Sequence, residues 1–292
     1  GETYFDCPYY EQLQYIGDTR IQALIGYYLG RDRSLQRNAV ETLAWSLMEN
    51  GLTQSRYPAR QTQIIPPFSL WWVVMLWDQL LYDTPLIEGD WHPQQTAGRR
   101  VVEGYGFPGE STSSFWNFVD WVPDWRAGVP PGNDKATANR ILWCLANSIA
   151  SRLSQRLSGS DIRLGDNLLE QFLTEPGGLV KSSTDADWQP SEHAEAMLRF
   201  AQLMHGQEAS PWPGGSLAGA NAARCTFYFS YYKHLAMSAR DDAPFDYMAE
   251  LAPWKEMIES GLTTFAENPE PTRSDCHAWS AHPILGFFQI VA

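Results

Sequence analysis

The feature that most limits the fold of this chain is the helical spacing of its apolar residues, which recurs from one end to the other. Within residues 13–28, 40–47, 138–149 and 194–201 the apolar side chains return every three or four positions, so each segment would present one apolar face. The strict alternation that is typical of β-strands is scarce. We therefore expect an all-α protein whose helices are separated by loops rich in Gly, Pro and Asp.

A long all-helical chain can form either a helical-repeat solenoid or a closed barrel of helix pairs. No signature returns at a fixed period of about 34 or 40 residues, which disfavours the solenoid. The loops are unequal in length, and residues 115–134 are rich in Trp, Asp and Pro. Loops of this kind more often line a site than merely connect helices. The sequence thus favours one barrel domain over residues 1–292.

Composition and charge narrow the class of partner. The chain carries 21 Lys and Arg against 34 Asp and Glu, a net charge of −13, so a nucleic-acid partner is disfavoured. No apolar run reaches the roughly 18 residues of a membrane span, and residues 68–81 read better as a buried helix. The 13 Trp and 13 Tyr are compatible with a carbohydrate partner, because amphipathic rings suit the faces of sugars.

The cysteine and histidine residues give no sign of a metal or another cofactor. The cysteines are widely spaced and lack a CxxC pair, which indicates buried thiols rather than disulfides; they are Cys7, Cys144, Cys225 and Cys276. His277 and His282 are five residues apart, a poor spacing for a metal pair without a third ligand. We expect neither a metal nor a cofactor. A periplasmic or secreted location is favoured over a cytoplasmic one.

Acidic residues gather at the N-terminus, in the segment that runs from Asp6 to Asp18. Pro8 fixes a turn, Glu11 falls near the first turn of the following helix, and Asp18 lies two turns later on about the same face. Three carboxylates can therefore converge on one end of a cavity. A solvated helix start remains an alternative, because acidic residues there complement the helix dipole.

A second acidic segment lies near the C-terminus. Glu267 sits at the edge of a proline-rich loop beside apolar residues, and His277 and Trp279 follow just before the last apolar run. Such a setting can raise the pKa of a carboxyl group by desolvation or aim it into a cleft. Taken alone, Glu267 could equally be an ordinary loop acid.

Together these segments resemble the α-L-rhamnosidases of glycoside hydrolase family 78. The opening signature of that family is Asp-Cys-Pro, then an acidic residue, then an aromatic-x-Gly-Asp ending, and residues 6–18 match it with Glu11 as the acid. The family's base-bearing segment, Thr-Thr-x-x-Glu, is matched by residues 263–267, and a downstream His by His277. A middle Asp-Trp loop is matched by Asp120 and Trp121. The matches span nearly the whole chain in the family's order.

Three positions depart from the family pattern. Many members have Arg before the acid, Trp before the Gly-Asp and Trp before the base, where this chain has Tyr10, Tyr15 and Ala266. These substitutions alter the surface that would line the sugar.

The resemblance implies a fold and a set of roles. The fold would be an (α/α)₆ barrel, complete or without its first helix or last turns, excised from a larger protein with flanking β-sandwich domains. Glu11 would be the general acid and Glu267 the general base of an inverting reaction on terminal α-L-rhamnosides. The remaining positions would bind substrate; they are Asp6, Asp18, Tyr15, Trp72 or its neighbour Trp71, Asp120, Trp121, His277 and Trp279.

Two further hypotheses stay open on the sequence alone. The same barrel could act on another deoxy sugar or on a uronic acid glycoside, although an anionic sugar would call for Arg or Lys in the pocket. The chain could also be a carbohydrate-binding relative that has lost catalysis. A panel of aryl glycosides separates the first case, and sugar binding without turnover identifies the second.

Overall fold

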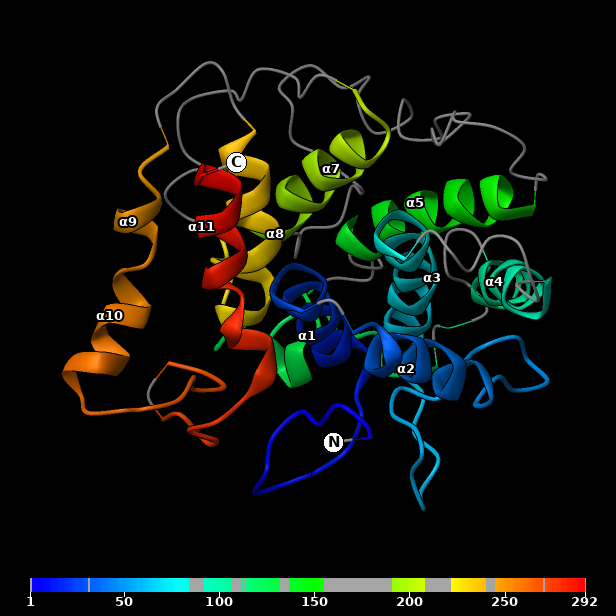
Figure 1. Ribbon diagram of the computed structural model, residues 1–292, viewed down its shortest axis with the longest axis horizontal. Helices are drawn as coiled ribbons and strands as arrows, with labels where there is room; N and C mark the ends of the chain where they lie inside the picture. Colours follow the sequence, from blue (N-terminus) through cyan, green and yellow to red (C-terminus); the bar gives the residue numbers. More distant parts are fainter. Residues whose placement is uncertain are drawn as a thin grey trace.

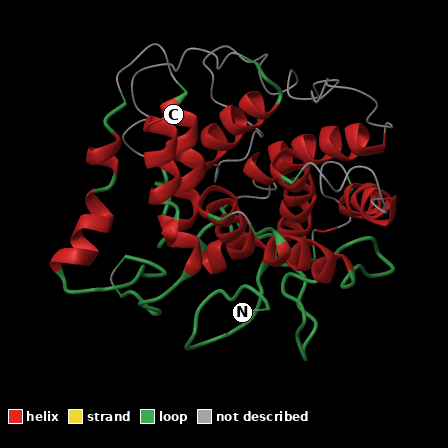
Figure 2. Ribbon diagram, in the orientation of Figure 1, coloured by secondary structure: helices red, strands yellow, loops and turns green. Residues whose placement is uncertain are grey.

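A computed structural model of the chain describes residues 2–30, 32–83, 92–106, 112, 114–131, 137–154, 191–207, 222–239, 245–269 and 271–291. Every regular element within these residues is a helix (Figure 2). The α-helices are α1 Ile16–Leu29, α2 Ser34–Ala44, α3 Pro66–Tyr82, α4 His92–Tyr105, α5 Thr137–Ser154, α7 Glu192–Met204, α8 Phe227–Ser238, α9 Tyr247–Glu250, α10 Ala252–Glu259 and α11 Pro283–Val291. Two short 3-10 helices, η3 Arg126–Gly128 and η4 Ala278–Ala281, complete the described elements. The apolar stripes predicted from the sequence fall on α1, α2, α5 and α7.

The helices follow one another around a ring, as expected for an all-α (α/α)₆ barrel (Figure 1). Helix α3 packs on α1, α4 and α5, and α7 lies between α5 and α8. The first helix, α1, also contacts η4 and α11 near the other end of the chain. The ring therefore brings the beginning and the end of the sequence side by side.

Helix α3 forms the centre of the core. Its residues from Pro66 to Leu80 are all buried, including Trp71 and Trp72. Proline at its first turn costs no hydrogen bond, because the first N–H groups of a helix have no partner within it. The expectation of a buried helix over residues 68–81 is thus confirmed, except that Leu81 is exposed. No helix among the described residues combines the length and the apolarity needed to cross a membrane.

One buried ion pair fastens α1 to α3 and α8. The guanidinium of Arg20 donates to both carboxylate oxygens of Asp78, at 2.8 and 3.2 Å, and to the hydroxyl of Tyr232. Its carbon Cζ lies 5.2 Å from the ring centre of Trp71. A buried charge is tolerated when its donors are paired in this way.

All four cysteines are free thiols, as predicted. Cys7 and Cys144 are buried and Cys225 is partly buried. The prediction of burial is wrong for Cys276, which is exposed because it lies on a loop at the edge of the domain.

Candidate active site

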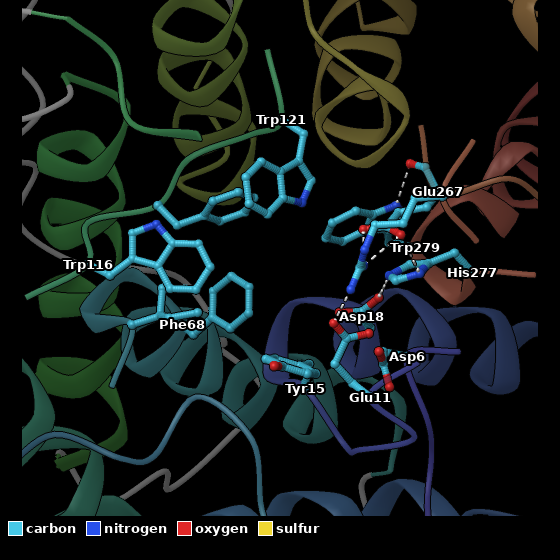
Figure 3. A pocket seen from close by; sticks show the side chains of 13 residues that line it. Asp6, Glu11, Tyr15, Asp18, Phe68, Trp116, Trp121, Glu267, His277 and Trp279 are labelled. Atoms are coloured by element: carbon cyan, nitrogen blue, oxygen red, sulfur yellow. Dashed lines mark hydrogen bonds and ion pairs between the residues drawn. The ribbon is translucent and has the colours of Figure 1, made fainter. Parts of the chain in front are cut away.

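A cavity of about 430 Å³, partly open to solvent, lies where the two ends of the chain meet. Its lining is Asp6, Glu11, Tyr15, Asp18, Ile65, Phe68, Trp116, Phe118, Trp121, Glu267, Arg273, His277 and Trp279. Figure 3 shows two walls: Tyr15, Phe68, Trp116 and Trp121 on one side, and the carboxylates with His277 and Trp279 on the other.

The acidic N-terminal segment is held as a closed loop. The N–H of Asp6 donates to the carbonyl of Leu13 at 3.0 Å, and the N–H of Leu13 donates to Oδ1 of Asp6 at 2.8 Å. Glu11 therefore projects from a loop that is pinned at both ends, and its Oε2 accepts from the Cys7 thiol at 3.7 Å. This arrangement places Glu11 in the loop before α1 rather than in the first turn of a helix.

The segment around Glu267 is fixed by backbone bonds of its own. The N–H of Glu267 donates to the carbonyl of Ser274 at 2.8 Å, and the indole of Trp279 donates to the carbonyl of Glu267 at 3.0 Å. The N–H of Ala278 donates to the carbonyl of Asp6 at 2.9 Å, so this segment is bonded directly to the N-terminal loop. Glu267 is only 2% exposed and faces the cavity.

His277 connects two of the carboxylates. Its Nε2 lies 3.0 Å from Oδ1 of Asp18, and its Nδ1 lies 3.7 Å from Oε2 of Glu267. Burial lowers the pKa of this imidazole, but the negative charges of Asp18 and Glu267 outweigh burial and the pKa lies above its ordinary value. Burial in turn raises the pKa of Glu267, although His277 and Arg273 counteract part of that rise. His277 is thus placed to orient the Glu267 carboxylate.

Arg273 lies between the two predicted catalytic residues and was not predicted. Its Nη1 donates to both carboxylate oxygens of Glu267, each at 2.9 Å, and its Nη2 donates to Oε1 of Glu11. One guanidinium therefore bridges an acid from the beginning of the chain and an acid from its end. The only signal in the sequence was an arginine six residues after Glu267.

The pKa shifts of the N-terminal carboxyls do not favour the protonated Glu11 that a general acid requires. Burial raises the pKa of Asp6 to about 6, and the charge of Asp18 adds to this rise. Burial also raises the pKa of Glu11, but hydrogen bonds from Arg273 and Asp6 outweigh it, and the pKa lies below its ordinary value. In the empty cavity it is Asp6, rather than Glu11, that holds a proton more readily.

Aromatic rings form the opposite wall. The ring of Trp121 lies 5.1 Å from that of Phe118 and 6.0 Å from that of Trp116, and Tyr15 meets Phe68 edge to face at 6.5 Å. The guanidinium of Arg56 donates to the hydroxyl of Tyr15 and fixes its ring. Burial raises the pKa of Tyr15 to about 12. This wall offers an apolar surface with one phenol, a combination that suits the C–H face of a sugar.

Eight of the ten predicted site residues line the cavity, and two do not. Trp72 is fully buried in α3, and its indole donates to the carbonyl of Val40 at 3.1 Å. Asp120 is also fully buried; it lies 2.8 Å from Nε2 of His193 and accepts from the N–H of Thr226 at 2.8 Å. The predicted sugar contacts of these two residues are therefore corrected to structural roles. Sequence reasoning missed Ile65, Phe68, Trp116, Phe118 and Arg273.

Three side chains at the cavity have the spacing of a metal site. Asp6, Cys7 and His277 each offer a ligand atom, and these atoms lie within 4.8 Å of one another. The Asp6 carboxylate already accepts from Leu13, and His277 already pairs with Asp18. These commitments leave a metal without a free set of donors, so we assign none, and the expectation of no metal stays a prediction.

Comparisons with known proteins give one likeness. No model of a protein family and no curated protein matches this chain. Its fold is similar to the solved structure of a rhamnosidase from Klebsiella oxytoca with rhamnose bound, with a TM-score of 0.67 and 20% sequence identity. The chain shares that rhamnosidase's fold. The match covers 99% of this chain and 60% of the other, and it confirms the predicted all-α (α/α)₆ class.

Proposed function

We propose that this chain is the catalytic domain of an inverting glycoside hydrolase that removes terminal α-L-rhamnosyl residues. Glu11 is the general acid and Glu267 the general base. The observation that carries the proposal is that these carboxylates, 256 positions apart in the sequence, face one cavity and share one guanidinium. The ordered motif matches and the rhamnose held by the structural neighbour support the choice of sugar.

The bridge through Arg273 sets an upper limit on the distance between the two carboxylates, and this limit is compatible with inversion. Each terminal nitrogen of Arg273 binds a different carboxylate, so their nearest oxygens are at most about 8 Å apart, two hydrogen bonds plus the width of a guanidinium. Inverting glycosidases separate their carboxyl groups by roughly 6.5–9.5 Å to leave room for a water. A site that holds a guanidinium between its acids has space for that water once Nη2 leaves Glu11.

The remaining lining residues have roles that follow from their chemistry. Asp6 and Asp18 accept hydrogen bonds from sugar hydroxyls, and His277 orients Glu267 or binds a further hydroxyl. Tyr15, Trp121 and Trp279 pack against the apolar surface of the 6-deoxy sugar. Phe68 and Trp116 extend that surface.

The charge of the cavity favours a neutral sugar over a uronic acid. Four carboxyl groups line the cavity, and the basic residues in its lining are one arginine, Arg273, and one histidine, His277. Arg273 is already paired with two of those carboxylates, so the cation that an anionic sugar requires is occupied. A carboxylate on the substrate would therefore meet repulsion.

We also propose that residues 1–292 form one catalytic domain of a larger protein with flanking β-sandwich modules. The chain spans 60% of the length of the rhamnosidase that it resembles. Residues 6–18 and residues 267–279 line the same cavity, which favours one domain over two.

The test is hydrolysis of a series of aryl α-L-rhamnosides by the wild type and by Glu11→Gln and Glu267→Gln. Each variant should lose about 10²- to 10⁴-fold in rate. The Glu11→Gln deficit should shrink as the leaving group becomes more acidic, because such a group departs without a proton, whereas the Glu267→Gln deficit should not. Glu41→Gln, an exposed glutamate on α2, is the control. Unchanged turnover in both site variants would rule out the assigned pair.

A further inference from the structure

The side chain of Arg273 is held at the mouth of the cavity from three directions. Glu267 accepts two hydrogen bonds from Nη1, Glu11 accepts one from Nη2, and the ring centre of Tyr10 lies 4.5 Å from Cζ. A guanidinium that is stacked on an aromatic face and paired with carboxylates is well oriented.

The backbone at this residue is unusual for an arginine. Arg273 has a φ of 55°, in the left-handed region that residues other than glycine seldom adopt. A short turn holds it there: the N–H of Ser274 donates to the carbonyl of Thr272 at 2.6 Å, and the carbonyl of Ser274 accepts from Glu267. The turn that positions the predicted base therefore also aims Arg273 between the two acids.

This placement conflicts with the role of a general acid. A guanidinium bonded to a carboxylate stabilises the ionised form, whereas Glu11 must carry a proton to release the leaving group. The two contacts are unequal. Glu267 receives two bonds and its side chain is 3% exposed, while Glu11 receives one and its side chain is 24% exposed. The contact with Glu11 is therefore the one that a substrate can displace.

We propose that Arg273 is a positioning residue that acts as a clamp. Before substrate binds, it is bonded to both Glu11 and Glu267. When substrate binds, Arg273 releases Glu11 and stays bonded to Glu267. The inference rests on the proposed function. When the sugar enters, its glycosidic oxygen takes the place of Nη2 beside Glu11, which can then be protonated. Nη1 continues to hold Glu267 ionised, as a base requires.

The other groups around the pair fit this exchange. Glu11 faces Asp6, the Cys7 thiol and Tyr15, and Glu267 faces His277, which in turn contacts Asp18. Asp6 shares a hydrogen bond with Glu11, and burial raises its pKa to about 6. Asp6 is therefore a nearby proton source once Arg273 leaves Glu11. Among these described neighbours, only Arg273 carries a permanent positive charge and contacts both Glu11 and Glu267.

The first measurement is a carbon NMR titration of side-chain carboxyls in protein labelled at glutamate, assigned with Glu11→Gln and Glu267→Gln. Removing the cation in Arg273→Met should raise the pKa of both Glu11 and Glu267. Arg273→Lys, which keeps the charge but cannot bridge both acids, should raise only that of Glu11. Arg37→Met is the matched control, because Arg37 makes a two-bond pair with Asp83 at 43% side-chain exposure, against 41% for Arg273.

Adding L-rhamnose tests the release. At saturation the pKa of Glu11 in the wild type should rise, while that of Glu267 should not change. Turnover gives a second readout: the whole pH profile of kcat/KM should move to higher pH in Arg273→Met, because both limbs report carboxyls whose pKa has risen. A merely structural role would lower the profile without moving it.

The outcomes separate the clamp from the proposed function. Unchanged carboxyl pKa values in a folded Arg273→Met overturn the clamp, and a Glu11 pKa that does not respond to bound rhamnose overturns the release. If rhamnose perturbs no carboxyl in any variant, the proposed substrate is wrong, and the Arg273→Met titration still decides the clamp. Circular dichroism checks the fold of each variant, and the wild-type titration with sugar stands even if both Arg273 variants fail to fold.

Discussion

At the scale of single residues, Asp6 shows most clearly that burial in this site disfavours an ionised carboxyl group. It is 3% exposed, and burial beside Asp18 raises its pKa from 3.8 to about 6. The ionised form is therefore less favourable in the folded protein than in the unfolded chain. A carboxyl group that only supported the fold would gain nothing from this placement.

Replacing Asp6 by Asn removes that cost. Well below pH 4, Asp6 is protonated in both states. As the pH rises through about 4 towards 6, the unfolded chain ionises first, so the wild type loses stability over this window. Asn keeps the oxygen that accepts from Leu13 and stays neutral. The free energy of unfolding of Asp6→Asn, relative to the wild type, should therefore increase by about 2 kcal/mol between pH 4 and pH 8 in urea titrations. A difference that is equal at both pH values, or equal to that of Asp124→Asn, would contradict this.

Residues that a motif placed lie at the cavity, whereas the sequence could not place residues whose position depends on the direction of a side chain. Glu11 and Glu267 could be predicted because each belongs to an ordered motif. Trp71 and Trp72 are adjacent on a helix that is buried on all sides, so the sequence could not say whether either meets the cavity. Arg273 lies in a loop, and its backbone there adopts a left-handed conformation that no pattern in the sequence predicted.

At the scale of elements, the loop between α4 and α5 joins the cavity wall to two distant helices. Trp121 faces the cavity, while its neighbour Asp120 points into the core. Asp120 accepts from the N–H and hydroxyl of Thr226, the residue before α8, and contacts His193 at the start of α7. The Asp-Trp pair was predicted as a unit, but adjacent side chains on an extended chain point in opposite directions.

Truncating Asp120 should therefore damage stability rather than the cavity lining. Asp120→Ala leaves buried donors on Thr226 and His193 without an acceptor, at a cost of about 3 kcal/mol or more. Denaturant titration measures this loss. Asp124→Ala, an exposed aspartate on the same loop, should change stability by less than about 0.5 kcal/mol. A loss below about 1 kcal/mol for Asp120→Ala would argue against its structural role.

At the scale of the whole molecule, the fold works by closing a ring. Helix α1 contacts α11 and η4, and the N–H of Ala278 donates to the carbonyl of Asp6, so the site exists only when the two ends of the chain meet. The sequence could predict the barrel because helical periodicity and motif order survive without an alignment. The positions of Phe68, Trp116 and Phe118 in the aromatic wall could not be predicted, because they depend on which rings face inward after the barrel closes.

Because the cavity exists only when the ring of helices has closed, sugar binding should also stabilise the whole folded protein. A ligand that binds only the folded cavity adds about 2.7 kcal/mol at 100 times its Kd. L-rhamnose should therefore raise the thermal midpoint of the wild type in calorimetry, and the rise should shrink in Trp121→Ala. An equal rise in both proteins would place the sugar elsewhere.

The central claim is that Glu11 and Glu267 act across one sugar with a water between them. Proton NMR of the first product formed from an aryl α-L-rhamnoside tests it most directly. The anomeric signal of β-L-rhamnose should appear first and convert to the α form only by mutarotation. Initial release of α-L-rhamnose would contradict the account, because retention of configuration requires a double displacement rather than one direct attack by water.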